Sequence, residues 1–188
     1  MKRFVVGVSG ASAMPLTECL LQTLHHLPDT EVHLIISDGA RQVLQQECSC
    51  SVDTLQAYVH TVYEAADMAA SPSSGSWQHD GMIVCPCSMS SLASIASGAG
   101  MNLLHRAADV TLKEGRKLVI IPRETPLNSI HIDNMRRLAL AGATIMPFMP
   151  AFYFLPQSIE DILTHFCGRI LDQMGIENSL VKRWHNGL

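Results

Sequence analysis

Short, almost uninterrupted runs of apolar residues recur along the chain, and segments of helical character separate them. Such runs are typical of strands in a parallel sheet that helices cover on both faces. We expect strands at residues 3–9, 31–37, 81–87, 117–121 and 144–146. We expect helices at residues 14–26, 40–47, 88–97, 103–113, 130–141 and 158 to about 174. The alternation predicts an α/β fold, a three-layer, Rossmann-like, doubly wound parallel sheet.

Local signals support several of these boundaries. Pro15 falls in the first turn of its helix, where a missing N–H is tolerated, and Asn102 is a candidate N-cap. Gly175 is placed to end the last helix. The 188 residues contain neither an internal repeat nor a linker long enough to divide them. We therefore expect a single domain over residues 1–188, with a C-terminal helical tail from about residue 158.

Composition excludes some classes of function. Apolar residues make up 47% of the chain, yet no run approaches the roughly 18 residues that a membrane span needs. Net charge is −4 and no basic run is present, so we expect neither a membrane nor a nucleic-acid partner. The excess of apolar residues favours a homo-oligomer. Gly7 and Gly10 interrupt the first apolar run too early for a signal peptide, so the six cysteines are expected to be reduced thiols in the cytoplasm.

The sequence holds groups that a metal ion could use, namely Cys48 with Cys50, Cys85 with Cys87, and His33, His79 and His105. Their spacing does not match the common zinc patterns, and the two cysteine pairs fall at very different places in the expected fold. We therefore expect no metal. Cys87, at a helix start, could be an activated thiolate, although a small loop-filling residue is the simpler interpretation.

Three expected strands end in loops of small and hydroxyl residues, at the sheet edge where open α/β folds bind ligands. These loops are Ser9-Gly10-Ala11-Ser12, Ser37-Asp38-Gly39 and Pro86-Cys87-Ser88-Met89-Ser90-Ser91. Small residues let the backbone approach a ligand, and helix N-termini suit a phosphate. A serine at one helix start is more simply a cap, so the signal lies in the combination. The dinucleotide and Walker patterns are absent, which favours a mononucleotide-like phosphate over NAD or ATP.

Charged and aromatic residues near the ends of elements are further candidates for the site. Arg123 follows the fourth expected strand directly and should face the ligand crevice, where its guanidinium suits phosphate. Arg106, Lys113 and Arg169 are weaker candidates, because most such residues are solvated surface charges. Glu47 and Glu124 could transfer protons if held near the site, and Tyr153 and Trp184 could line an apolar pocket. The loop at residues 71–77 is either a surface loop or a substrate contact.

Five motifs together resemble the bacterial flavin prenyltransferases, the partners of ubiquinone-pathway and phenolic-acid decarboxylases. They are Val8-Ser9-Gly10-Ala11-Ser12, Ile83-Val84-Cys85-Pro86-Cys87-Ser88, Arg106-Ala107-Ala108-Asp109-Val110-Thr111-Leu112-Lys113-Glu114, Pro122-Arg123-Glu124-Thr125-Pro126-Leu127 and Pro150-Ala151-Phe152-Tyr153-Phe154-Leu155-Pro156-Gln157-Ser158. Their order and spacing match, and the resemblance extends from Met1 to about Trp184.

The resemblance implies a flavoprotein-type fold and a metal-independent transferase. Such an enzyme joins a dimethylallyl group from dimethylallyl monophosphate to N5 and C6 of reduced FMN. The product, prenylated FMN, serves a client decarboxylase in quinone synthesis or phenolic acid breakdown. The resemblance also implies a large symmetric homo-oligomer, often a dodecamer, and it carries over the monophosphate rather than the diphosphate as the donor.

The resemblance also assigns roles by position. FMN would be held by Gly10, Ala11, Ser12, Ser37, Ser88, Met89, Ser90, Ser91 and Arg123. The prenyl donor would be bound by Ser74, Arg106, Lys113, Arg123, Glu124, Tyr153, Arg169 and Trp184. Ser12 and Glu47 would assist proton movements near the flavin, and Lys113, Glu124 and Tyr153 would take part in the departure of the phosphate.

The chain departs from the family pattern at two places. Ala13 stands where the family has a second glycine, and a positive φ there would be strained. The turn Gly115-Arg116-Lys117 replaces the usual basic pair and proline. None of the expected phosphate-binding or acid residues is missing, so we expect an active enzyme.

Two other functions remain open. One is an FMN-dependent decarboxylase of cysteine-type substrates, although the asparagine-bearing loops of that family are absent. The other is a non-catalytic FMN-binding subunit of an aromatic acid decarboxylase. Storage of FMN would not require Lys113, Glu124, Tyr153 and Arg169.

Overall fold

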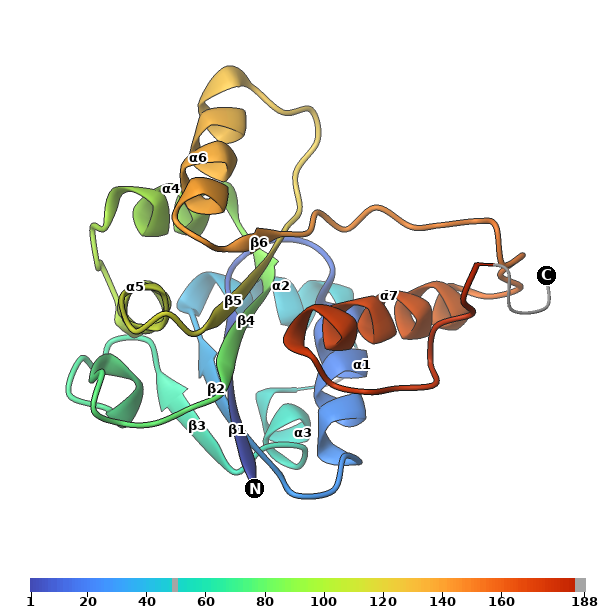
Figure 1. The fold of residues 1–188 in the computed structure, drawn as a ribbon, viewed down its shortest axis with the longest axis horizontal. Coiled ribbons are helices and arrows are strands. Elements are labelled where there is room, and N and C mark those ends of the chain that lie inside the picture. Colours follow the sequence, from blue (N-terminus) through green and yellow to red (C-terminus); the bar gives the residue numbers. More distant parts are fainter. Residues whose placement is uncertain (49–50, 185–188) are drawn as a thin grey trace.

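The fold is built on one six-stranded parallel sheet (Figure 1). The computed structural model describes residues 1–48 and 51–184. The strands are β1 Lys2–Val8, β2 Thr30–Ile36, β3 Thr61–Glu64, β4 Gly81–Cys87, β5 Lys117–Pro122 and β6 Thr144–Ile145. The helices are α1 Met14–His25, α2 Asp38–Glu47, α3 Val52–Gln56, α4 Met89–Ser97, α5 Leu103–Lys113, α6 Ser129–Leu140 and α7 Ile159–Met174, with a short 3-10 turn at Ser71–Ser73.

The order of the strands locates the ligand-binding edge. It is β3-β2-β1-β4-β5-β6, so the chain builds outward from β1 in one direction and then from β4 in the other. Ligands of doubly wound sheets bind beyond the carboxyl ends of the strands, at this point of reversal. The loops that follow β1 and β4 therefore lie at the expected binding edge.

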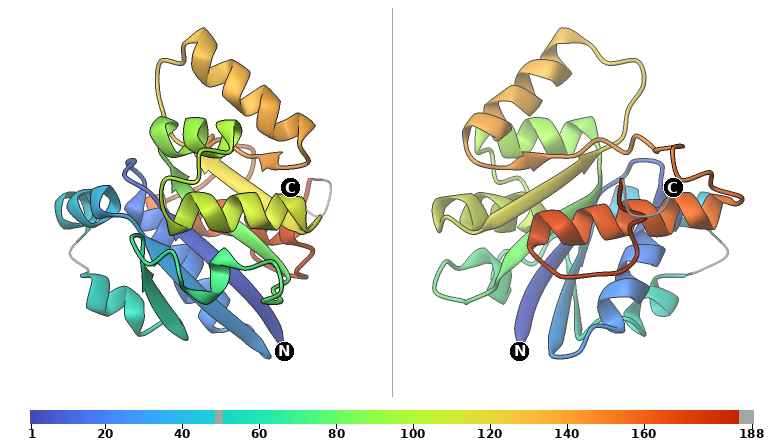
Figure 2. Two further views of the ribbon diagram at one scale, coloured as in Figure 1. Left: turned by 90° about the vertical axis from the view of Figure 1, so that its left-hand side faces the viewer. Right: turned by 45° about the vertical axis from the view of Figure 1, so that its right-hand side comes forward.

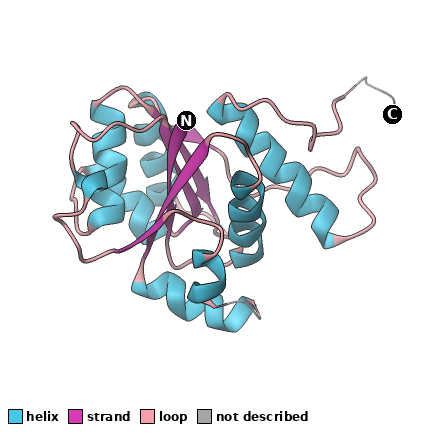
Figure 3. Ribbon diagram, turned by 90° about the horizontal axis from the view of Figure 1, so that it is seen from below, coloured by secondary structure: helices cyan, strands magenta, loops and turns pink. Residues whose placement is uncertain are grey.

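Helices cover both faces of the sheet, as Figures 2 and 3 show. One apolar core joins the sheet to α1, α2, α3 and α7, and a second joins it to α4, α5 and α6. Neighbouring strand residues alternate between them, since Val6 belongs to the first core and Val5 to the second. A Cβ atom at Gly7 would come within 3.0 Å of the Leu104 side chain, so α5 packs directly against the backbone of β1.

The structure confirms the expected α/β class and corrects several boundaries. All five expected strands are present, but the sixth, β3, was missed because it is a four-residue edge strand without a continuous apolar run. The short helix α3 was missed too. Ser37 and Ser88, expected inside a strand and a helix, are N-caps of α2 and α4. No helix in the described ranges is long and apolar enough to span a bilayer.

Four buried histidines couple stability to pH. They are His33, His79, His105 and His165, and burial lowers the pKa of each. These histidines therefore bind protons in the unfolded chain as pH falls through about 6.5, whereas in the folded chain they bind protons only at lower pH. The free energy of unfolding is therefore larger above that pH and decreases below it.

We predict that the unfolding midpoint in urea falls between about pH 8 and about pH 6, before carboxylates titrate. Replacing buried His33 with Gln should flatten this dependence, whereas replacing exposed His26 with Gln should preserve it. A midpoint that rises as the solution is acidified would contradict the assignment.

Candidate functional site

The loops after β1 and β4 are joined by hydrogen bonds through Ser9. Its hydroxyl donates to the carbonyl of Pro86 at 3.2 Å and accepts from the backbone N–H of Ser88 at 2.8 Å. The backbone N–H of Ser9 also donates to Pro86, at 3.2 Å. Residues from two central strands are thereby fixed as one surface at the carboxyl edge of the sheet.

The loop after β2 meets this surface at two glycines. A Cβ atom at Gly10 would lie only 2.9 Å from the carbonyl carbon of Gly39, which is backbone and cannot rotate away. A side chain at residue 10 would therefore push the two loops apart. The small residues noted in the sequence meet one another here, and Ala11 beside them is buried.

The serines of these loops cap helices. Ser37 accepts from the backbone N–H of Ala40, and Ser88 accepts from that of Ser91, both at 3.2 Å. The Ser91 hydroxyl lies 3.1 Å from Nε2 of buried His105. The simpler interpretation of single serines as caps is therefore correct for Ser37 and Ser88. The backbone N–H groups at the start of α4, which include those of Met89 and Ser90, face the same edge.

Glu47, at the end of α2, holds the start of α1. Its Oε2 accepts from the backbone N–H groups of Ala13 at 2.9 Å and Met14 at 3.0 Å. Partial burial acts to raise the pKa of this carboxyl, but hydrogen bonds from Ser12, Met14 and Ala13 and the charge of Arg123 outweigh it and lower the pKa. Glu47 is therefore an anion at neutral pH and a hydrogen-bond acceptor at the flank of the edge.

Arg123 and Glu124 follow β5 at the same edge. The backbone N–H of Arg123 donates to the carbonyl of Cys87 at 3.2 Å, which ties this loop to the β4 loop. Both side chains are exposed and line a hollow of about 260 Å³. Arg123 therefore lies where the sequence places it, at the mouth of the crevice.

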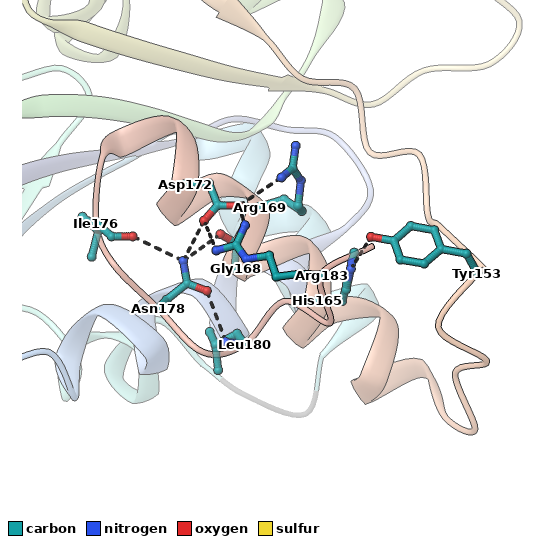
Figure 4. A network of polar contacts seen from close by, with 9 residues as sticks. All are labelled: Tyr153, His165, Gly168, Arg169, Asp172, Ile176, Asn178, Leu180 and Arg183. Carbon is teal, nitrogen blue, oxygen red and sulfur yellow. Dashed lines mark hydrogen bonds and ion pairs between the residues drawn. The ribbon is translucent and has the colours of Figure 1, made fainter. Parts of the chain in front are cut away.

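A second group of predicted residues lines a larger hollow, of about 640 Å³. Tyr153, Arg169 and Trp184 all contribute to its wall. The Tyr153 hydroxyl lies 3.0 Å from His165 Nε2, and its ring meets Trp184 edge-on at 5.4 Å (Figure 4 shows the hydroxyl contact). The hollow thus combines aromatic walls with a guanidinium group.

The segment after β6 connects the two groups. It continues beside β5, where the N–H of Phe148 donates to the Pro122 carbonyl at 3.3 Å. Pro147 and Met149 line both hollows described above. Pro150 borders the larger hollow and also a third one, of about 470 Å³, lined by Ser12 and Glu47. The carboxyl edge of the sheet and the aromatic hollow are therefore neighbours.

A third group lies elsewhere in the chain. Lys113 ends α5 four residues before β5 begins, whereas Arg123 follows the other end of β5. Because β5 has six residues, its ends are on the order of 17 Å apart at about 3.3 Å per residue. Lys113 is paired with Glu114 instead. One chain by itself does not bring Lys113 to Arg123, and α5 packs on the opposite face of the sheet from α7, which carries Arg169.

Ser74 and Arg106 accompany Lys113 in this third group. Nε of Arg106 donates to the carbonyl of Ser73 at 3.2 Å, and its Nη1 pairs with Asp109 at 2.8 Å. A Cβ atom at Gly75 would lie 2.7 Å from Nζ of Lys113. The loop at residues 71–77 therefore packs on α5.

No three His, Cys, Asp or Glu side chains of the described residues converge as metal ligands. Cys85 and Cys87 are buried in opposite cores of the sheet, and burial raises the pKa of each thiol to about 12. Cys87 therefore stays protonated, and it is the last residue of β4 rather than a residue of a loop or a helix start. Cys50 lies outside the described residues.

Comparison with known proteins identifies the family. The model of the Flavoprotein family matches residues 1–171. The flavin prenyltransferase LpdB of Lactiplantibacillus plantarum is 50% identical over 184 residues, which cover 98% of each chain. The flavin prenyltransferase UbiX of Halalkalibacterium halodurans is 42% identical over 191 residues, covering 96% of this chain and 92% of that one. The chain belongs to the flavin prenyltransferase family.

Solved structures agree with this family. A dodecameric FMN-dependent UbiX-like decarboxylase from Escherichia coli O157:H7 superposes with a TM-score of 0.95 at 45% identity, over 98% of this chain and 100% of that one. AnUbiX in complex with FMN and dimethylallyl pyrophosphate superposes with a TM-score of 0.96 at 43% identity, over 100% of this chain and 98% of that one. The peptidyl-cysteine decarboxylase EpiD, at 16% identity and a TM-score of 0.66, shares only the fold. The predicted family, flavoprotein-type fold and transferase class are confirmed.

Sequence reasoning missed His165, Asp172 and Arg183 of this flavin prenyltransferase, and it named His105 only as a possible metal ligand. His105 contacts Ser91 and His165 contacts Tyr153, while Asp172 pairs with both Arg169 and Arg183. Arg183 lines the larger hollow and stands beside Trp184 in the chain, which is the one sequence signal that could have found it.

Ala13 has a left-handed backbone conformation that favours glycine. Its φ is 107° and its ψ is 32°, in the left-handed region that L-residues other than Gly avoid. The N–H of Ala13 is nonetheless held by Glu47, as described above. The loop thus holds an alanine in a left-handed conformation, at the expense of local strain.

We predict that Ala13→Gly raises the free energy of unfolding by roughly 0.5–1 kcal/mol, because relief of the strain exceeds the added flexibility of the unfolded chain. Urea unfolding of the two proteins measures the difference. Ala11→Gly is the matched control, since Ala11 is buried and has no positive φ, and it should destabilise the fold. Equal effects of the two substitutions would remove the strain argument.

Proposed function

We propose that the protein transfers a dimethylallyl group from dimethylallyl monophosphate to N5 and C6 of reduced FMN, forming prenylated FMN for a partner decarboxylase. One observation carries this proposal. A hollow with two arginines and aromatic walls borders the loop edge where a flavin phosphate would bind. A protein that only stored FMN would have no use for this second, cationic hollow.

The residues at the loop edge suit FMN. Backbone N–H groups at the starts of α2 and α4 suit a phosphate, and Arg123 follows β5 at the same edge of the sheet as a cation. The close contact of Gly10 with Gly39 leaves backbone rather than side chains facing the ligand. We therefore assign FMN binding to the predicted residues, namely Gly10, Ala11, Ser12, Ser37, Ser88, Met89, Ser90, Ser91 and Arg123.

The larger hollow suits the prenyl donor. Breakage of the allylic carbon–oxygen bond leaves negative charge on the phosphate, which the guanidinium of Arg169 stabilises. We assign proton donation to the departing phosphate to Tyr153, in this hollow, or to Glu124, in the neighbouring one. The aromatic face of Trp184 stabilises the electron-poor allyl group, and the apolar walls exclude water. The flavin supplies the nucleophilic nitrogen and carbon.

Glu47 and Ser12 are assigned to proton movements at the flavin. The lowered pKa of Glu47 makes it an acceptor at neutral pH, and Ser12 hydrogen-bonds to it, so the pair forms a path for a proton. The hollow that these residues line shares Pro150 and Ile162 with the wall of the larger hollow.

We assign Ser74, Arg106 and Lys113 to the donor site of a neighbouring copy of the chain. Arg106 and Lys113 lie on α5, across the sheet from the helix that carries Arg169. Met149, which lines the larger hollow, and Phe152, Leu155 and Ile159, which follow it in the chain, are apolar and exposed. Such a surface favours association. The relative from Escherichia coli O157:H7 is a dodecamer, and we propose a homo-oligomer of that kind here.

The setting we propose is the cytoplasm, with a decarboxylase as the client. Cys19, Cys85, Cys87 and Cys167 are free thiols in the core, which suits a reducing compartment. Reduced FMN is also easier to maintain there. The client uses prenylated FMN in quinone synthesis or phenolic acid breakdown.

The proposed reaction predicts a defined change in mass. Anaerobic incubation of the protein with reduced FMN and dimethylallyl monophosphate should yield flavin heavier by one prenyl unit, detected by mass spectrometry of the released flavin. The diphosphate donor, run in parallel, distinguishes the two phosphates. Unchanged flavin with FMN bound would instead favour storage, and loss of carbon dioxide from a cysteine-type peptide would favour a decarboxylase.

The shared site predicts complementation between inactive variants. Lys113→Ala and Tyr153→Phe should each lose most prenyl transfer as separate proteins. Mixed oligomers, formed by co-expression of the two, should recover about a quarter of wild-type activity, since that fraction of sites combines two intact halves. Recovery should be absent if Lys113 and Tyr153 serve the same chain's site.

A further inference from the structure

The chain after α7 turns back and lies along that helix, as Figures 1 and 4 show. The contact is close at Gly168, where a Cβ atom would lie 2.6 Å from Cγ2 of Val181 and 2.9 Å from Oδ1 of Asn178. The amide of Asn178 donates to the carbonyl of Gly168 at 3.2 Å and to Oδ1 of Asp172 at 3.1 Å. The returning segment is therefore seated on the helix by specific contacts.

This return brings Arg183 to the same carboxylate that holds Arg169. Two nitrogens of Arg183 donate to the two oxygens of Asp172, at 2.6 and 2.8 Å. Nη1 of Arg169 donates to Oδ2 of the same carboxylate at 3.0 Å. The two guanidinium nitrogens that share Oδ2 are thus no more than about 6 Å apart.

The charges in this group do not cancel. Hydrogen bonds from Arg183 lower the pKa of Asp172, and those from Asn178 and the charge of Arg169 act in the same direction. Together they outweigh partial burial, so Asp172 is one anion between two cations. Both arginines line the larger hollow, and their side chains are more than two-fifths exposed, whereas that of Asp172 is 16% exposed. A net positive charge therefore faces the space where an anion can enter.

We propose that Arg183 binds the phosphate of the prenyl donor together with Arg169, and that Asp172 is a positioning residue for both. The assignment rests on the proposed function, in which this hollow takes the donor. A guanidinium has five N–H donors, and the bonds to Asp172 occupy two on Arg183, so three remain for a phosphate. Because Trp184 is the next residue, the same anchor sets the indole against Tyr153.

The alternative is that Arg183 only fastens the C-terminal segment to α7. A fastening role and a phosphate-binding role differ in what they do to a free anion. Inorganic phosphate, as a competitor of the donor, reports on the anion site without requiring the prenyl chain. Its inhibition constant is therefore the decisive quantity, measured on the FMN-loaded protein beside the KM of the donor.

We expect Arg183→Gln to raise both the KM for dimethylallyl monophosphate and the inhibition constant of phosphate about tenfold or more, with a smaller change in kcat. The KM and the inhibition constant of Arg183→Lys should lie between those of wild type and Arg183→Gln, because lysine keeps the charge but not the bidentate guanidinium geometry. Arg136→Gln is the matched control, since Arg136 pairs with Asp133 on α6 and is exposed. An Arg183→Gln protein with unchanged phosphate inhibition would overturn the proposal, whatever its melting temperature.

Asp172→Asn tests the positioning role separately. Removal of a negative charge would by itself strengthen phosphate binding, so charge alone predicts a lower inhibition constant. Positioning predicts a higher one, because the two arginines lose their common partner. Tighter phosphate binding by Asp172→Asn would therefore overturn the role of Asp172.

The failure of this inference is distinguishable from that of the proposed function. Calorimetric titration of the FMN-loaded wild-type and Arg183→Gln proteins with inorganic phosphate needs no turnover. If wild type transfers no prenyl group yet binds phosphate through Arg183, the anion site is supported and the proposed reaction is refuted. If wild type transfers the prenyl group and Arg183→Gln binds phosphate as well as wild type does, the proposed reaction is supported and this inference is refuted.

Discussion

The whole arrangement depends on a parallel sheet that is apolar on both faces. Strands β1 and β4 are buried between two cores, and their backbone groups are satisfied by neighbouring strands, so neither face can accept a polar ligand. Polar chemistry is confined to the ends of the strands. The order of the strands then selects the carboxyl ends of β1 and β4, which is where the loops containing Gly10 and Ser88 meet.

The same constraint explains why the predicted site divides into groups. Residues that follow a parallel strand and residues that precede it lie at opposite ends of the sheet, a strand length apart. Arg123 follows β5 and Lys113 precedes it, so no side-chain rotation within one chain can unite them. In the site that we propose, which uses both residues, a second copy of the chain supplies the missing part, and oligomerisation then becomes a requirement of the chemistry.

Much of the fold followed from pattern, while much of the site did not. Apolar runs predicted the central strands, but β3 is a half-covered edge and carries no such run. Family motifs located Arg123 and Tyr153, and a departure from the pattern located the strained Ala13. Asp172 could not be predicted, and Arg183 had only its place beside Trp184 as a signal, because each resembles a surface charge until the return of the chain brings them together.

The pairing of Asp172 with two arginines has a physical reason. Two guanidinium groups within about 6 Å repel one another, by a few kcal/mol at an effective dielectric constant near 20. Left alone, they would separate into solvent and would have to be gathered again by each incoming phosphate. The carboxylate offsets the repulsion before the ligand arrives and keeps both groups oriented. An anion then binds to a site whose charges are already in place.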